Sequence, residues 1–110
     1  MATLDFNLLL NQMINAGKAS FSDKWPGVKD LATNSFQKLA QTLVDIEKMR
    51  IEGTIDETQA RLLIDMEKNT FKIVLLSIEG LGLLAVEDAL NAALKIIKDT
   101  VNKAIGFILI

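Results

Sequence analysis

The feature that most limits what this chain can fold into is its hydrophobic spacing, which repeats every three or four residues along nearly all of its length. Such spacing places apolar side chains on one face of an α-helix, whereas a half-buried strand would need strict alternation. The only proline is Pro26, tyrosine is absent, and hairpin signals are lacking. The 110 residues leave room for one core. The sequence therefore predicts a single all-α domain, a hairpin or bundle of three to four helices with one long C-terminal helix.

A short first helix is expected over residues 3–16. Thr3 or Asp5 can cap its start, and Gly17 is expected to end it. We expect residues 17–26 to form a linker, because they hold small and polar residues and lead into a proline.

The second helix is expected over residues 27–52, with the preceding proline in its first turn and Gly53 at its end. Directly after this glycine, Thr54 and Glu57 match a capping box, in which Thr54 would cap the next helix and Glu57 would reach back.

A long helical region is expected over residues 55–104, because no proline interrupts it. A straight helix from Ile55 to about Lys103, roughly 49 residues, would measure ~73 Å, far beyond a compact domain whose radius of gyration would be near ~13 Å. Two alternatives follow. The helix kinks or breaks at Gly80-Leu81-Gly82 and folds back, or it stays long and other subunits cover it.

The apolar residues are concentrated at the C-terminal end. Residues 71–110 contain 25 hydrophobic residues of 40, against 30 of the other 70. The shorter helices are not expected to cover that much apolar surface, so association with other chains is predicted. The expected interface has a bulky row and a small row on the C-terminal helix, together with the apolar tail: Leu83, Val86, Leu90, Leu94, Ile97 and Val101; Ala85, Ala89 and Ala92; Phe107 and Ile108.

One carboxylate interrupts this pattern. Glu79 falls on the same helical stripe as Leu83 and Val86, which makes it a candidate buried charge. An unpaired buried carboxylate costs several kcal/mol. We therefore expect Glu79 either to form an ion pair or to be exposed by the neighbouring glycines.

Composition excludes several classes of function. Histidine and cysteine are both absent, which removes disulfides, thiolate nucleophiles and the usual zinc and haem ligands. The formal charge of −2, with both signs interspersed, does not favour nucleic acid. Neither a phosphate-binding loop nor a calcium-binding loop occurs. We expect no catalytic activity, cofactor, metal or small-molecule substrate, and the absence of a signal peptide and of cysteine favours the cytoplasm.

The leading expectation is a structural or scaffolding subunit that forms homo-oligomers through its hydrophobic C-terminal half. Two alternatives remain: a helical protein that associates with membranes through residues 71–86 and 104–110, and a small adaptor that binds one partner helix.

Overall fold

The computed structural model describes residues 3–110, and it confirms the all-α class, since these residues contain no strand. The elements follow in chain order as α1 (Phe6–Phe21), the 3₁₀ turn η1 (Ser22–Lys24), α2 (Trp25–Glu52), α3 (Glu57–Leu76) and α4 (Leu83–Ile105).

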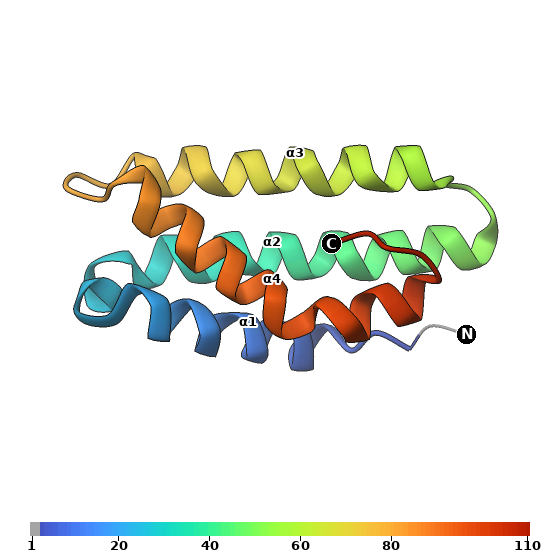
Figure 1. The fold of residues 1–110 in the computed structure, drawn as a ribbon, viewed down its shortest axis with the longest axis horizontal. Coiled ribbons are helices and arrows are strands. Elements are labelled where there is room, and N and C mark those ends of the chain that lie inside the picture. Colours follow the sequence, from blue (N-terminus) through green and yellow to red (C-terminus); the bar gives the residue numbers. More distant parts are fainter. Residues whose placement is uncertain (1–2) are drawn as a thin grey trace.

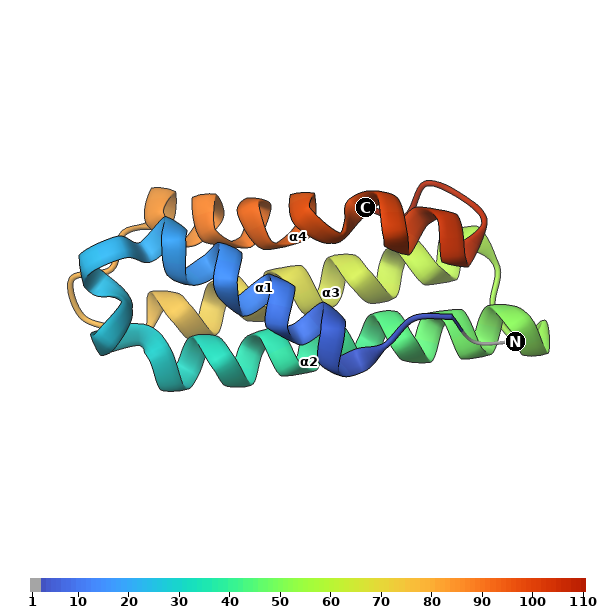
Figure 2. The ribbon, with the colours of Figure 1, turned by 90° about the horizontal axis from the view of Figure 1, so that it is seen from below.

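Successive helices run in opposite directions (Figure 1). α1 and α3 form opposite edges of the molecule, and α2 and α4 lie on opposite faces between them (Figures 1 and 2). α4 packs most extensively on α1, while α2 packs on both α1 and α3. The molecule measures 43 × 22 × 19 Å, so the extended ~73 Å helix is not formed.

The region 55–104 is divided into two helices and does not form one kinked helix. α3 ends at Leu76, and a turn over residues 77–82 leads into α4. Gly80 adopts a left-handed backbone conformation (φ 82°) in this turn, which a residue with a side chain adopts only with strain. The turn sends α4 back along the molecule, where its apolar face meets α1.

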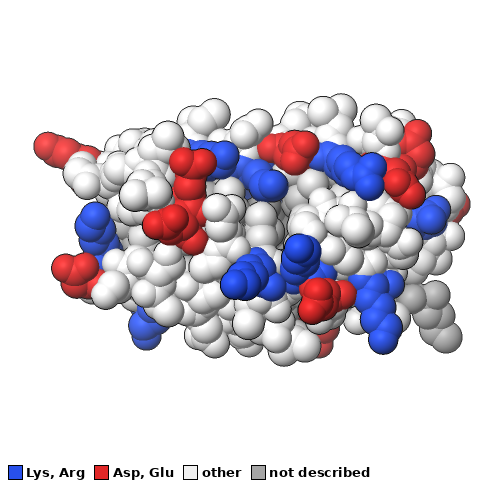
Figure 3. Space-filling view, in the orientation of Figure 1, with Lys and Arg blue, Asp and Glu red and all other residues white. Residues whose placement is uncertain are grey.

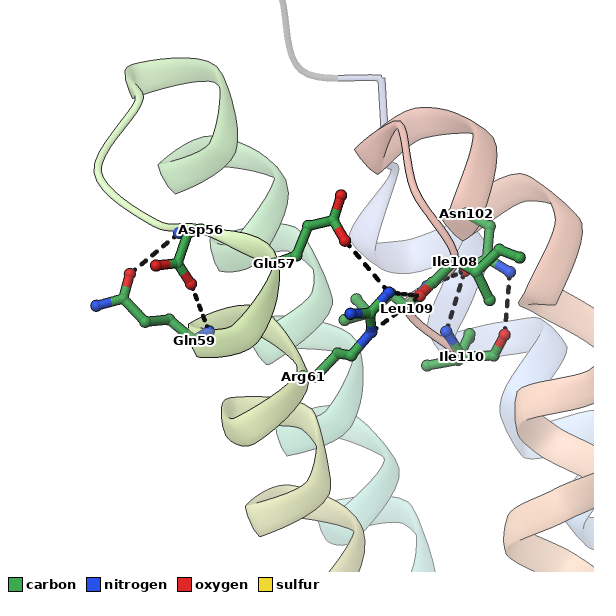
Figure 4. A network of polar contacts seen from close by, with 8 residues as sticks. All are labelled: Asp56, Glu57, Gln59, Arg61, Asn102, Ile108, Leu109 and Ile110. Carbon is green, nitrogen blue, oxygen red and sulfur yellow. Dashed lines mark hydrogen bonds and ion pairs between the residues drawn. The ribbon is translucent and has the colours of Figure 1, made fainter.

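The start of α3 also differs from the expected capping box. Asp56 is the N-cap: its carboxylate accepts a hydrogen bond from the Gln59 N–H (2.8 Å), and the Gln59 side chain accepts one from the Asp56 N–H (3.0 Å; Figure 4). The Thr54 hydroxyl instead donates to the Met49 carbonyl. Asp56 and Gln59 have the same three-residue spacing as Thr54 and Glu57, so they can form the same capping box two residues further along the chain.

The expected linker over residues 17–26 is wrong. α1 begins after the N-cap Asp5 and continues through Gly17 to Phe21, and only the three residues of η1 separate it from α2. Gly17 is buried within the helix, and a Cβ at this position would lie 2.6 Å from two ring atoms of Phe36 on α2. The glycine therefore allows α1 and α2 to approach closely and does not end the helix.

This contact predicts a destabilising Gly17→Ala substitution. Alanine gains about 1 kcal/mol in helix propensity, but its methyl group would displace the Phe36 ring at a cost of about 1–3 kcal/mol. We expect a lower free energy of unfolding in urea. Gly27→Ala is the control, since nothing lies within 4 Å of a Cβ there. A Gly17→Ala protein as stable as the Gly27→Ala protein would contradict the proposed contact.

Candidate functional site

The bulky row expected to form the interface lies mostly inside the molecule. Val86, Leu90, Leu94, Ile97 and Val101 are buried in the core that α4 shares with the other helices. Leu83 is the exception in this row and is 52% exposed. The expectation that this row contacts another chain is wrong for its buried members, because the reversal after α3 allows the chain to cover them itself.

The small row and the tail likewise contain both buried and more exposed residues. Ala89 is buried, whereas Ala85 and Ala92 are half-buried beside the core. In the tail, Phe107 is half-buried and Ile108 is 72% exposed. Most of the predicted interface therefore stabilises the single chain.

The buried-charge candidate Glu79 is exposed, since it lies in the turn between α3 and α4. The buried carboxylate belongs to Glu47 on α2, whose side chain is 1% exposed. The sequence contains a signal for it. At 100° per residue, Glu47 falls on the stripe formed by Phe36, Ala40 and Leu43, in the middle of the buried face of α2.

Glu47 fixes the segment that precedes α1. Its carboxylate accepts hydrogen bonds from the Thr3 N–H (2.9 and 3.0 Å), the Thr3 hydroxyl (2.7 Å) and the Leu4 N–H (2.9 Å). Burial raises the pKa of Glu47, but the hydrogen bonds from Leu4 and Thr3 outweigh burial and lower the pKa below its ordinary value of 4.5. The ionised carboxylate thus anchors the N-terminal segment to the far end of α2.

This anchor predicts a dependence of stability on pH. Because the pKa of Glu47 is lower in the folded state, its contribution is complete above pH 4.5 and is lost as the pH falls through the folded-state value. Glu47→Gln should lower the free energy of unfolding at pH 7 by about 2–3 kcal/mol, since an amide cannot accept all of these bonds. The difference from the native protein should shrink toward pH 3. A difference independent of pH would contradict this role.

The C-terminal tail is held by Asn102 of α4. The Asn102 amide oxygen accepts hydrogen bonds from the Leu109 N–H (2.8 Å) and the Ile110 N–H (3.0 Å), and its NH₂ group donates to the Ile110 carbonyl (3.0 Å; Figure 4). Leu109 is buried beneath this contact. One side chain thus satisfies the backbone of the last two residues and directs Leu109 into the core.

Arg50 and Arg61 also contact the C-terminal tail. Arg61 of α3 donates to the Ile108 carbonyl through Nε (3.3 Å) and Nη2 (3.1 Å), and Glu57 pairs with its guanidinium group at 3.4 Å (Figure 4). The guanidinium carbons of Arg50 and Arg61 lie 5.5 and 5.6 Å from the centre of the Phe107 ring, within the range of cation–π attraction. The tail therefore connects α3 to α4.

We expect Asn102→Ala to release the tail. Three hydrogen bonds would be lost, and the apolar end would no longer be directed into the core. Hydrogen exchange at the Leu109 and Ile110 amides should accelerate at least tenfold, and a carboxypeptidase should remove the end faster. Asn91→Ala, an exposed position on the same helix, is the control. Unchanged exchange in Asn102→Ala would show that the tail is held by other contacts.

A surface that the sequence pattern missed lies on the outer face of α3. Four large apolar side chains are exposed there at helical spacing: Leu62 (60%), Met66 (56%), Ile73 (71%) and Leu76 (40%). Asn69, also exposed, lies on the same line. These five residues form the outer α3 seam, opposite the buried residues Ala60, Ile64, Phe71 and Leu75.

The outer α3 seam runs along one edge of the molecule. In Figure 3 the outline of the molecule along α3 is mostly white, and a row of Lys, Arg, Asp and Glu side chains lies beside it on the face turned to the viewer. The spacing of 4, 3, 4 and 3 residues is visible in the sequence, but the pattern alone could not show which of the two apolar faces of this helix would be buried.

The described residues contain no group of three acidic side chains suited to a metal ion. None of the helices in residues 3–110 is long and apolar enough to cross a membrane. The chain matches no protein-family model, no curated protein and no solved structure.

Proposed function

We propose that this protein is a non-enzymatic structural or scaffolding subunit that assembles with copies of itself through the outer α3 seam. The observation that carries the proposal is the exposure of Leu62, Met66, Ile73 and Leu76 along one line of one helix. A contiguous row of large apolar side chains on an otherwise well-packed domain is typical of an association surface.

The internal packing supports this choice of surface. Phe36 and Phe71 pack with ring centres 5.0 Å apart, so the inner face of α3 is already occupied by α2. The outer face is left without a partner in the single chain. A helix with an apolar stripe on both faces is expected to be covered on both faces.

The outer α3 seam fits a protein partner better than a lipid surface. Helices that lie on membranes carry many Lys and Arg residues beside the apolar face. The outer α3 seam is bordered by residues of both signs, including Asp65 and Lys72, and Asn69 lies at its centre.

Association predicts an assembly larger than 12.1 kDa at micromolar concentration. Ile73→Asp should weaken it at least about tenfold, because a carboxylate buried against apolar groups costs more than ~1.4 kcal/mol. Ile96→Asp is a matched control, since Ile96 is 55% exposed on α4, away from the outer α3 seam. Sedimentation velocity measures both variants.

A native protein that stays monomeric at 100 micromolar would contradict the proposal. Monomers that float with lipid vesicles would instead favour the membrane-associated alternative. Equal loss of assembly in Ile73→Asp and Ile96→Asp would place the interface elsewhere on the molecule.

A further inference from the structure

The outer α3 seam has the spacing of a short coiled coil. Leu62, Met66, Asn69, Ile73 and Leu76 follow one another at 4, 3, 4 and 3 residues, which matches alternating d and a positions of a heptad. The four apolar members are all at least 40% exposed. A partner of the same kind is the α3 helix of a second copy, which presents an identical row.

The flanking residues distinguish between pairing geometries. Asp65 and Lys72 are the charged residues of α3 that each precede an a position, on one side of the outer α3 seam, while the uncharged Thr70 flanks the other side. In an antiparallel pair the charged sides of the two helices face each other, whereas in a parallel pair each charged side faces the uncharged side of its partner. Only antiparallel pairing brings the charged flanks together.

Charge complementarity then selects one antiparallel register. When the two-fold axis passes between residues 67 and 68, Lys72 of one copy lies two residues, ~3 Å along the helix, from the position directly opposite Asp65 of the other, which is within reach of an ion pair. A shift of one heptad would bring Lys72 of one copy equally close to Lys72 of the other, which is a repulsive pair. The first register also pairs Leu62 with Ile73 of the second copy, so the most exposed aliphatic residue of the row is covered.

Asn69 fits the same register. The two Asn69 side chains would lie about 2 Å on either side of the two-fold axis, measured along the helix, because each is 1.5 residues from the axis. Each Asn69 lies opposite Met66 of the other copy, and the two amides are offset by ~4.5 Å along the helix, so they can hydrogen-bond only diagonally across the axis. A polar residue at a core position of a coiled coil fixes register at some cost in stability.

The ion pairs of the single chain do not oppose this arrangement. Lys72 lies 3.8 Å from Glu87, and Asp65 lies 4.0 Å from Lys68. These side chains are 31–65% exposed, and exposed pairs of this kind contribute little to stability. Asp65 and Lys72 are therefore free to exchange partners when two copies meet.

We infer that two copies of this chain pair through the outer α3 seam as an antiparallel two-helix contact, with Asp65–Lys72 ion pairs on its flank and Asn69 across its two-fold axis. The inference rests on the proposed function and specifies its geometry.

Disulfide trapping tests the geometry, since the chain has no cysteine of its own. Leu62→Cys and Ile73→Cys proteins are oxidised separately and as an equimolar mixture. For the mixture, the antiparallel register predicts a covalent dimer of one Leu62→Cys chain and one Ile73→Cys chain. Its yield should be at least tenfold higher than the yield of covalent dimer from either variant alone. In a dimer of two copies of the same variant, the two cysteines would lie ~16 Å apart along the helices, which is too far for a disulfide. Ile96→Cys on α4 is the control and should not form dimers with either.

The outcomes separate the two proposals. Covalent dimers formed as readily by each variant alone would show parallel pairing and overturn the inference. An assembled native protein without the mixed dimer would overturn the register but not self-association. A native protein that is monomeric would overturn the proposed function, and the inference with it.

Charge exchange gives a second test of the register. Asp65→Lys and Lys72→Asp should each raise the dissociation constant roughly fivefold, and the double variant should restore it, because the two ion pairs re-form with reversed sign. Two single effects that simply add in the double variant would contradict the Asp65–Lys72 pairing.

Discussion

The reversal of the chain between α3 and α4 determines how the four helices pack. The C-terminal helix has an apolar stripe too large to leave in water, and a continuous helix would have carried it away from the other helices. Gly80, in its left-handed conformation, and the turn around it return α4 to the body of the molecule, where it packs on α1. As a result, Leu90 and Ile97 are enclosed by the chain itself. Leu83, Leu84 and Ile96 remain exposed on α4, whereas the exposed large apolar side chains of α3 lie in line on its outer face.

Both ends of the described part of the chain, residues 3–110, are fixed by one polar side chain each, and both contacts use backbone groups. The Glu47 carboxylate accepts from the N–H groups of Thr3 and Leu4, and the Asn102 amide binds the last two residues. Terminal segments have unpaired backbone donors and acceptors that need partners once they are buried. Supplying those partners from a helix lets short apolar segments complete the core without forming secondary structure.

The sequence pattern was sufficient where a local rule decides the structure and insufficient where a tertiary contact decides it. The all-α class follows from periodicity, and the end of α2 could be read from Gly53, because both depend on neighbouring residues only. Gly17 was misread as a helix end because its role is the contact with Phe36 on another helix. The predicted row on α4 does share one buried face except at Leu83, but the helix that it packs against could not be known before the direction of α4 was known. The outer α3 seam was missed for the same reason, since α3 is apolar on two faces and only packing against α2 shows which face is inside.

We propose that α4 belongs to the core of each chain and that the outer face of α3 is the surface used between chains. Hydrogen exchange followed residue by residue at low and high protein concentration tests it directly. We expect strong protection of α4 amides at every concentration, and slower exchange in α3 only as the concentration rises above the dissociation constant. Protection of α4 that rises with concentration while α3 stays unchanged would contradict it.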